Sequence, residues 1–161
     1  MKTFRDGVRL VLLISSAAMM GSCGTMPGPM NAPRSDTAEE NKRIVMEFSE
    51  LAFKRKQFRE AFEKYVVEDY IQHNPRVPDG REAAIKFLSG VARDNPQWVR
   101  EDKRFIAEGD VVVIHTHSRL KPEDRGSAIV DILRLKNGKI VEHWDVIQPI
   151  PEQAANKNTM F

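Results

Sequence analysis

The chain has 161 residues, 41% hydrophobic and 30% charged, a composition typical of a protein with one ordinary folded core. Its formal net charge of +2 comes from the N-terminal segment. Without Lys2, Arg5, Arg9 and Asp6, basic and acidic residues are equal in number, because the totals of 25 and 23 fall by three and by one. Nucleic-acid binding needs a persistent basic face, and nothing in this neutral domain argues for one, so we expect no nucleic-acid partner.

The first 22 residues have the pattern of an export signal. Basic residues precede a short apolar run, Leu10–Ile14, and small residues follow it up to Cys23. The run is too short to span a bilayer comfortably. Cys23 is the only cysteine, so it cannot form a disulfide within the chain. We therefore predict that residues 1–22 are a signal peptide.

This arrangement resembles the bacterial lipoprotein signal, in which small residues precede a cysteine that becomes the lipidated first residue. The resemblance implies a lipid anchor on Cys23 and attachment to a membrane of the cell envelope. Because Gly24 rather than Asp follows the cysteine, it also implies the outer membrane, on its periplasmic side. The alternative is an ordinary buried or free cysteine. Residues 23–36 hold three prolines and are typical of a flexible tether, which leaves residues 37–161 as one domain.

Three helices are predicted in the first half of this domain. Apolar residues recur at helical spacing over residues 37–54, over residues 57–67 and, after a Pro-Asp-Gly breaker, over residues 81–93. Between the second and third helices, Pro75 disfavours helix at Asn74 and favours a turn or an extended segment.

The hydrophobic period changes to two from Trp98 onward. This change predicts strands over residues 98–106 and 111–120 and a hairpin over residues 127–148. Three helices followed by an antiparallel sheet are an α+β order, because strands and helices do not alternate.

The predicted hairpin turns at Asn137-Gly138, a dipeptide that reaches positive φ at low cost. A two-residue loop would place Asp131 opposite Trp144, whereas a three-residue loop would place it opposite His143. We favour the three-residue loop. It gathers apolar side chains with Asp131, His143 and Asp145 on one face, a pattern typical of a pocket wall.

His115 and His117 are two residues apart in a predicted strand, so their side chains share one face. Such a pair can be half of a metal site, an acid–base pair or two hydrogen-bonded core histidines. We expect Asp131, on the next strand, to lie beside His117, which favours a functional role.

The order of three helices and a sheet, the segment 70–75, the His-Thr-His of residues 115–117 and the residues 130–148 together resemble the SnoaL-like polyketide cyclase family. This family belongs to the nuclear-transport-factor-two-like superfamily, and the resemblance covers residues 37–161. It implies a cone-shaped α+β barrel, in which three N-terminal helices pack against a strongly curved, mainly antiparallel sheet around an apolar pocket. It also implies a homodimer through the outer face of the sheet.

In these cyclases an aspartate on the penultimate strand is the acid–base residue of an intramolecular aldol closure, assisted by a histidine on the preceding strand. The resemblance assigns these roles to Asp131 and His117. An aldol reaction needs a base beside a carbonyl and a donor for the enolate oxygen. It requires no metal and no cofactor, so neither is predicted. We expect burial in an apolar pocket to raise the pKa of Asp131 toward neutrality.

Five further residues are candidates for substrate binding. We expect two of them, His73 and Asn74, at the mouth of the pocket, where they could orient a carbonyl group. Trp144 could stack on a substrate or fill the core. The full set is His73, Asn74, His115, His143 and Trp144. Glu142 and Asp145 are expected to be partners of Arg134 or of other basic groups.

The sequence therefore predicts a small acid–base enzyme that cyclises or isomerises a small apolar carbonyl compound. The alternative is a lipoprotein that binds an apolar ligand in the same pocket without turnover. A third hypothesis is a metal site, because His115, His117 and His143 with one carboxylate would satisfy zinc or iron.

Overall fold

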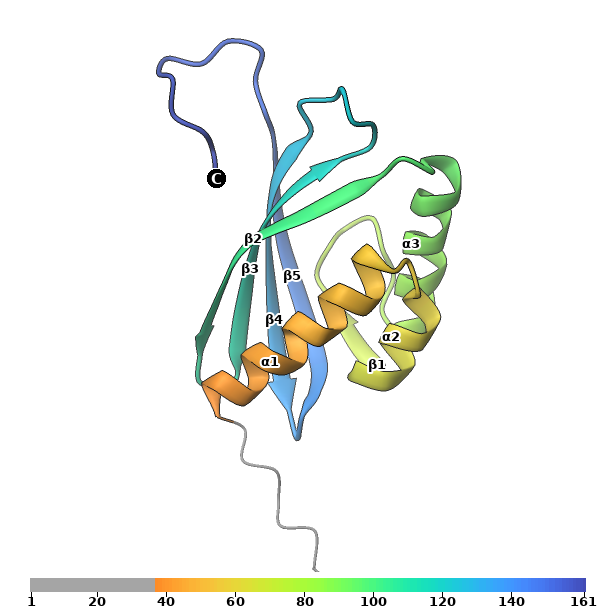
Figure 1. Cartoon of the computed structure of the whole chain (residues 1–161). Coiled ribbons are helices and arrows are strands. Elements are labelled where there is room, and N and C mark those ends of the chain that lie inside the picture. Colours follow the sequence, from red (N-terminus) through yellow and green to blue (C-terminus); the bar gives the residue numbers. More distant parts are fainter. Residues whose placement is uncertain (1–36) are drawn as a thin grey trace, which may run out of the picture. The chain divides into compact units, whose positions relative to one another are not determined.

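The computed structural model describes residues 37–161. Three α-helices and a single sheet confirm the predicted α+β class (Figure 1). The elements in chain order are α1 (Ala38–Ser49), the π-helix η1 (Glu50–Lys54), α2 (Phe58–Tyr65), β1 (Val66–Gln72), α3 (Arg81–Asp94), β2 (Val99–Glu108), β3 (Val111–Arg119), β4 (Ser127–Lys136) and β5 (Lys139–Pro149). Within the described residues, no helix is long and apolar enough to cross a membrane.

The five strands form one mixed sheet in the order β1-β5-β4-β3-β2. Only β1 pairs in parallel, with β5, and the other pairs are antiparallel. The edge strands β1 and β2 do not pair with each other, so the expected barrel stays open. Figure 1 shows the three helices against one face of the bent sheet, with α1 crossing the strands. This helix-covered face is the inner face, and the opposite one is the outer face.

Strand β1 is missing from the sequence prediction, which continued the second helix to Val67. The helix ends at Tyr65 instead, and the chain becomes extended at Val66. Two consecutive β-branched valines favour extended backbone. The partner of β1 is β5, more than 60 residues later, and local periodicity carries no information about so distant a partner.

Two buried side chains at the junction of α1 and the π-helix face the site. The wider turn of a π-helix changes which positions face inward. Ser49, at the end of α1, and Phe53, inside η1, are both buried. Both contact polar residues of the sheet, as described below.

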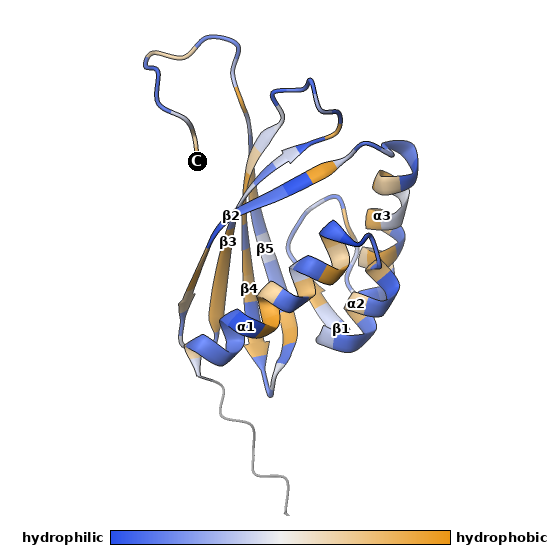
Figure 2. Ribbon diagram, in the orientation of Figure 1, coloured by the Kyte–Doolittle hydropathy of each residue, from blue (hydrophilic) through white to orange (hydrophobic). Residues whose placement is uncertain are grey.

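An aromatic cluster fills one end of the core. Phe48 packs edge-to-face on Phe53, Phe62 and Tyr65, with ring centroids 5.1 to 6.4 Å apart. Trp98, just before β2, stacks on Phe58, with ring centroids 6.2 Å apart. Offset and edge-to-face aromatic pairs stabilise beyond their buried area. Figure 2 shows hydrophobic segments of β3, β4 and β5 opposite the helices, where the sheet closes this core.

The hairpin β4–β5 has a two-residue turn followed by a bulge. Asn137 and Gly138 have φ values of 53° and 73°, and Leu135 pairs with Ile140. The extra residue Val141 then shifts the pairing by one.

Because of this shift, Asp131 lies opposite Asp145, and both predicted registers are wrong beyond the turn. The bulge nevertheless places the same residues of β5 on the face of Asp131 as a three-residue loop would. Asp131, His143 and Asp145 therefore line the same cavity, as the favoured register implied.

Candidate functional site

The helices and the inner face of the sheet enclose a cavity of about 270 Å³. Most of its lining is aromatic or aliphatic, so the apolar pocket predicted from the sequence is confirmed. The polar side chains in the lining come from β1, β2, β3, β5, β4 and the loop after β1. They are Gln72, Asn74, Arg76, Arg100, Ser118, Asp131, His143 and Asp145.

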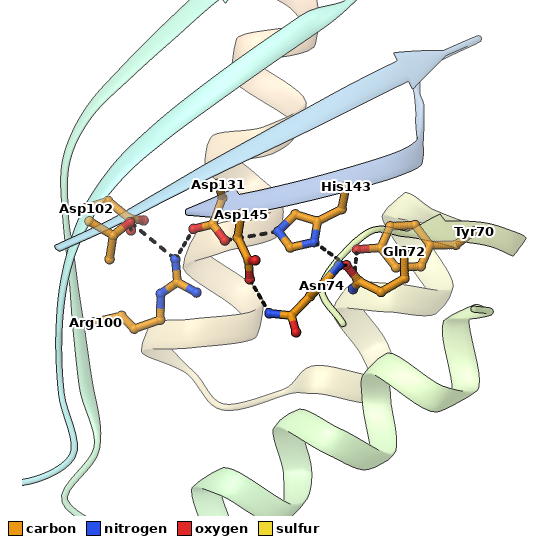
Figure 3. Close-up of polar contacts among 9 residues, drawn as sticks. Tyr70, Gln72, Asn74, Arg100, Asp102, Asp131, His143 and Asp145 are labelled. Atoms are coloured by element: carbon orange, nitrogen blue, oxygen red, sulfur yellow. Dashed lines mark hydrogen bonds and ion pairs between the residues drawn. The ribbon is translucent and has the colours of Figure 1, made fainter. Parts of the chain in front are cut away.

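Asp131 is ionised and held between two donors. Its Oδ2 accepts a hydrogen bond from Arg100 Nη2 at 2.5 Å, and its Oδ1 lies 3.1 Å from His143 Nε2 (Figure 3). Burial alone would raise the pKa of Asp131. The Arg100 charge and the His143 contact outweigh burial and lower the pKa to about 2. The expectation of a raised pKa is therefore wrong, and Asp131 is a weak proton acceptor.

Arg100 is held from several sides. Its guanidinium lies over the Phe53 ring, 4.0 Å from the centroid, and Nη2 also donates to Thr116 Oγ1 at 3.2 Å. The Thr116 hydroxyl in turn donates to Asp102 Oδ1 at 2.9 Å, and Ser49 donates to the other oxygen of Asp102. Within residues 37–161, Nη1 of Arg100 has no hydrogen-bond partner and Nε is buried without one. The N–H groups of Nη1, unlike that of the buried Nε, are therefore left for a ligand in the cavity.

His143 joins Asp131 to β1. Its Nδ1 lies 2.8 Å from Gln72 Oε1, which also accepts from the backbone N–H of Asn74 at 2.9 Å. Because a backbone N–H can only donate, the Gln72 atom at this junction is the carbonyl oxygen. Both ring nitrogens of His143 therefore face oxygen atoms, one of Gln72 and one of Asp131.

Tyr70 supplies a neutral hydroxyl to the cavity wall. Burial raises the pKa of this phenol well above its ordinary value, and the Asp131 charge adds to the effect. The hydroxyl oxygen accepts from Gln72 Nε2 at 3.3 Å. Tyr70 therefore keeps its proton and can serve as a hydrogen-bond donor.

Asp145 is the second carboxylate of the cavity. Its Oδ2 accepts from Asn74 Nδ2 at 2.6 Å, and within the described residues its other oxygen has no partner. Ligand atoms of Asp131, His143 and Asp145 lie within 4.8 Å of one another. Asp145 was expected to pair with a basic group. This prediction is wrong for Asp145, which bonds to the neutral amide of Asn74, and is confirmed for Glu142, which pairs with Arg134.

His73 and Trp144 lie outside the cavity. Their rings stack with centroids 4.7 Å apart and 5° between planes, and His73 Nε2 lies 2.8 Å from Glu142 Oε1. Neither residue lines the cavity. The expected position of His73 at the mouth of the cavity is therefore wrong, and the bulge at Val141 turns Trp144 to the outer face. Contact of either residue with a substrate stays a prediction. Asn74, by contrast, does line the cavity as expected.

His115 and His117 share a face of β3, as predicted, but it is the outer face. Their rings pack on Phe161, with centroids 5.4 and 4.4 Å away. His117 Nε2 also lies 2.7 Å from the backbone oxygen of Arg125.

The expected contact between His117 and Asp131 is therefore wrong. In the observed register, Asp131 pairs with Ile114 and His117 pairs with Ala128. The inward residues of β3 have even numbers, so both histidines point away from the cavity.

The predicted three-histidine metal set is not assembled, because only His143 faces inward. Asp131, His143 and Asp145 have the composition of a metal site. Two features oppose a divalent cation there: the Arg100 guanidinium occupies one oxygen of Asp131, and the His143 nitrogen faces the other. The site therefore fits acid–base chemistry better than metal binding.

Arg100 and Gln72 are the main site residues that the sequence analysis missed. A signal for Arg100 was present, since Trp98, Arg100 and Asp102 alternate in a predicted strand that starts with a large apolar residue. Alternation places all three on one face, and a buried arginine needs a buried acid. Gln72 gave no such signal, because its strand was not predicted.

Comparison with known proteins supports this architecture. A model of the SnoaL-like domain matches residues 45–143. The structure of TsrD from Streptomyces laurentii is 18% identical with a TM-score of 0.57, and the match covers 69% of this chain and 90% of that one. A protein from Jannaschia sp. CCS1, provisionally named a SnoaL-like polyketide cyclase, is 17% identical with a TM-score of 0.59. This match covers 71% of this chain and 89% of that one.

A protein from Kribbella flavida provisionally named a ketosteroid isomerase is 16% identical with a TM-score of 0.60, over 74% of this chain and 85% of that one. At these identities the solved structures establish the fold alone. No match was found among curated proteins. The domain model, which spans more than half of the chain, shows that the chain belongs to the SnoaL-like domain family.

Proposed function

We propose that this protein is a small acid–base enzyme that moves a proton on a small, mostly apolar carbonyl compound. The reaction would be an isomerisation or an aldol-type cyclisation. The observation that carries the proposal is a mostly apolar cavity lined by both a carboxylate with a free oxygen, Asp145, and a buried guanidinium with spare N–H groups, Arg100. The names of two neighbours, a cyclase and an isomerase, are consistent with it.

In this proposal Asp145 takes the role that the sequence analysis gave to Asp131. Both oxygens of Asp131 are engaged by Arg100 and His143, and its pKa is about 2. A carboxylate with so low a pKa removes protons poorly at neutral pH. Asp145 accepts one hydrogen bond, from a neutral amide, and keeps an oxygen for a proton beside the substrate carbonyl.

The other groups have supporting roles. Arg100 would donate to the oxygen that becomes negative in the enolate, where a fixed cation in an apolar cavity is most effective. Tyr70, which keeps its proton, would be a second donor. Asp131 is a positioning residue, because it orients Arg100 and His143 and does not itself accept the proton.

The test is exchange of α-hydrogens for deuterium in a panel of small linear and cyclic ketones, followed by NMR in D₂O. The chain should accelerate exchange of at least one ketone. Asp145→Asn should lower this rate by about 10²–10⁴-fold, the usual contribution of a general base. Asp110→Asn, at an exposed turn outside the cavity lining, is the matched control and should leave the rate unchanged. An unchanged rate in Asp145→Asn would refute the assignment.

Binding without turnover is the second candidate function. The observation that favours it is the pairing within the polar centre, since Asp131, Arg100, His143 and Gln72 already bond to one another. A binding protein would retain a ketone in the cavity and exchange no deuterium. The same experiment therefore separates the two functions.

The lipid anchor and the envelope location also stay proposals, since Cys23 and the signal lie outside the described residues. Metabolic labelling with an alkyne fatty acid should mark the wild-type chain and not Cys23→Ser. Labelling of both chains, or of neither, would contradict the anchor.

We likewise propose a homodimer through the outer face of the sheet. Ile106 of β2 and Val146 of β5 are 58% and 63% exposed on this face, and Val146 is two residues from Trp144 along β5. Sedimentation should show a dimer for the wild type and a monomer for the double variant Ile106→Lys and Val146→Lys. A monomeric wild type would contradict the proposal.

A further inference from the structure

The mouth of the cavity has an apolar rim. Phe87 of α3, Leu120 directly after β3 and Ile147 of β5 all line the cavity, yet they are 40%, 45% and 47% exposed. Single exposed hydrophobic residues are common, but these three come from different parts of the chain and all line the same cavity. An apolar ligand that covered them would remove this surface from water. The rim therefore favours a ligand with an apolar body.

Arg76 adds a positive charge to this rim. It is exposed, it lines the cavity, and within residues 37–161 its side chain has no hydrogen bond or ion pair. The only other arginine in the lining, Arg100, is paired with Asp131 in the interior. Arg76 is thus the arginine of the lining that is available to an acidic group of a ligand.

The backbone at Arg76 is held in place before a ligand binds. Asn74 Oδ1 accepts from the backbone N–H of Arg76 at 2.9 Å, and the Val77 N–H donates to the Asn74 carbonyl at 3.1 Å. The same Asn74 donates to Asp145. One residue therefore connects the backbone of Arg76 to the proposed base, and this pre-organisation lowers the cost of binding.

The interior of the cavity repels the acidic group of a ligand. The carboxylates of Asp131 and Asp145 both line the interior, and its guanidinium, that of Arg100, is already paired with Asp131. A ligand carboxylate would meet like charges at depth and a free guanidinium at the mouth. Its acid group should therefore stay at Arg76 while the apolar part enters.

We propose that the substrate is an amphipathic oxo acid, whose carbonyl and apolar chain enter the cavity and whose carboxylate stays at the mouth on Arg76. The carbonyl half of this inference rests on the proposed function. The acid half rests on Arg76 and on the charges of the interior, not on catalysis, so the two can fail separately.

Binding of octanoate and octanol tests the acid half, because neither compound has a ketone group beside which a base could remove an α-proton. Calorimetry should show that Arg76→Gln weakens the affinity for octanoate by about fivefold, the effect of losing one exposed ion pair. The affinity for octanol should stay unchanged. The matched control Lys86→Gln removes an exposed cation on α3 outside the lining and should change neither affinity. Equal octanoate affinity in wild type and Arg76→Gln, an equal loss in Lys86→Gln, or no octanoate binding to the wild type would overturn the proposal.

The deuterium-exchange assay with 7-oxooctanoate and 2-octanone tests the whole ligand. Arg76→Gln should raise KM for the oxo acid, leave its kcat unchanged and affect 2-octanone in neither constant. A lower kcat for both ketones would give Arg76 a different role and overturn the assignment. If octanoate binding depends on Arg76 but neither ketone exchanges, the proposed function fails and the acid site stands.

Discussion

Asp131 and Arg100 form an ion pair inside the protein, with side chains that are only 10% and 7% exposed. Removing one member of a buried pair leaves an uncompensated charge, which is far more costly than replacing both members. This relationship determines the ionisation of Asp131, the position of the spare N–H groups of Arg100 and the stability of the sheet centre.

Arg100→Met should destabilise the protein by about 3–5 kcal/mol, because Asp131 would stay buried without its cation. The double variant Arg100→Met and Asp131→Leu should recover most of this loss. Urea unfolding of the wild type, both single variants and the double variant measures the coupling. Additive losses in the double variant would show that the ion pair does not form.

The stability contributed by Asp131 should fall in acid. Its folded pKa of about 2 lies below the ordinary value of 3.8, so the ionised form stabilises the fold above about pH 4. The stability disappears as pH falls toward 2, and by linkage it amounts to about 2 kcal/mol. Unfolding of wild type and Asp131→Asn from pH 6 to 2.5 measures it. The difference between the two should shrink on acidification, and a growing difference would mean that burial raises this pKa.

His117→Ala should leave the deuterium exchange of ketones unchanged, because His117 lies on the outer face. It should loosen the C-terminal segment, whose Phe161 ring packs on His117. Hydrogen exchange of residues 150–161 should therefore become faster. Loss of ketone exchange in this variant, with a fold like that of the wild type, would contradict this expectation and favour the earlier hypothesis that His117 assists Asp131 in catalysis.

The sequence predicted those features that depend on local period. Helical spacing located the three helices, and alternation placed Asp131, His143 and Asp145 on one face even though the exact pairing was different. The two-residue turn and the extra residue of the bulge together shift the pairing by two residues from the favoured register. A shift of two leaves every side chain on its predicted face.

Features that depend on distant partners were not predicted. The alternation of His115 and His117 does not tell which face of β3 meets the helices, and only the pairing with β4 decides it. The pKa of Asp131 depends on Arg100, 31 residues earlier, which cancels the effect of burial. Strand β1 and its Gln72 likewise need the parallel pairing with β5.

A crystal structure of the chain with a bound small methyl ketone tests the central claim most directly. We expect the ketone in the inner cavity, its oxygen within hydrogen-bond distance of Arg100 Nη1 and its α-carbon beside the free oxygen of Asp145. Electron density for the ketone on the outer face near His115 and His117, or a ketone oxygen turned away from Arg100, would contradict the proposed site.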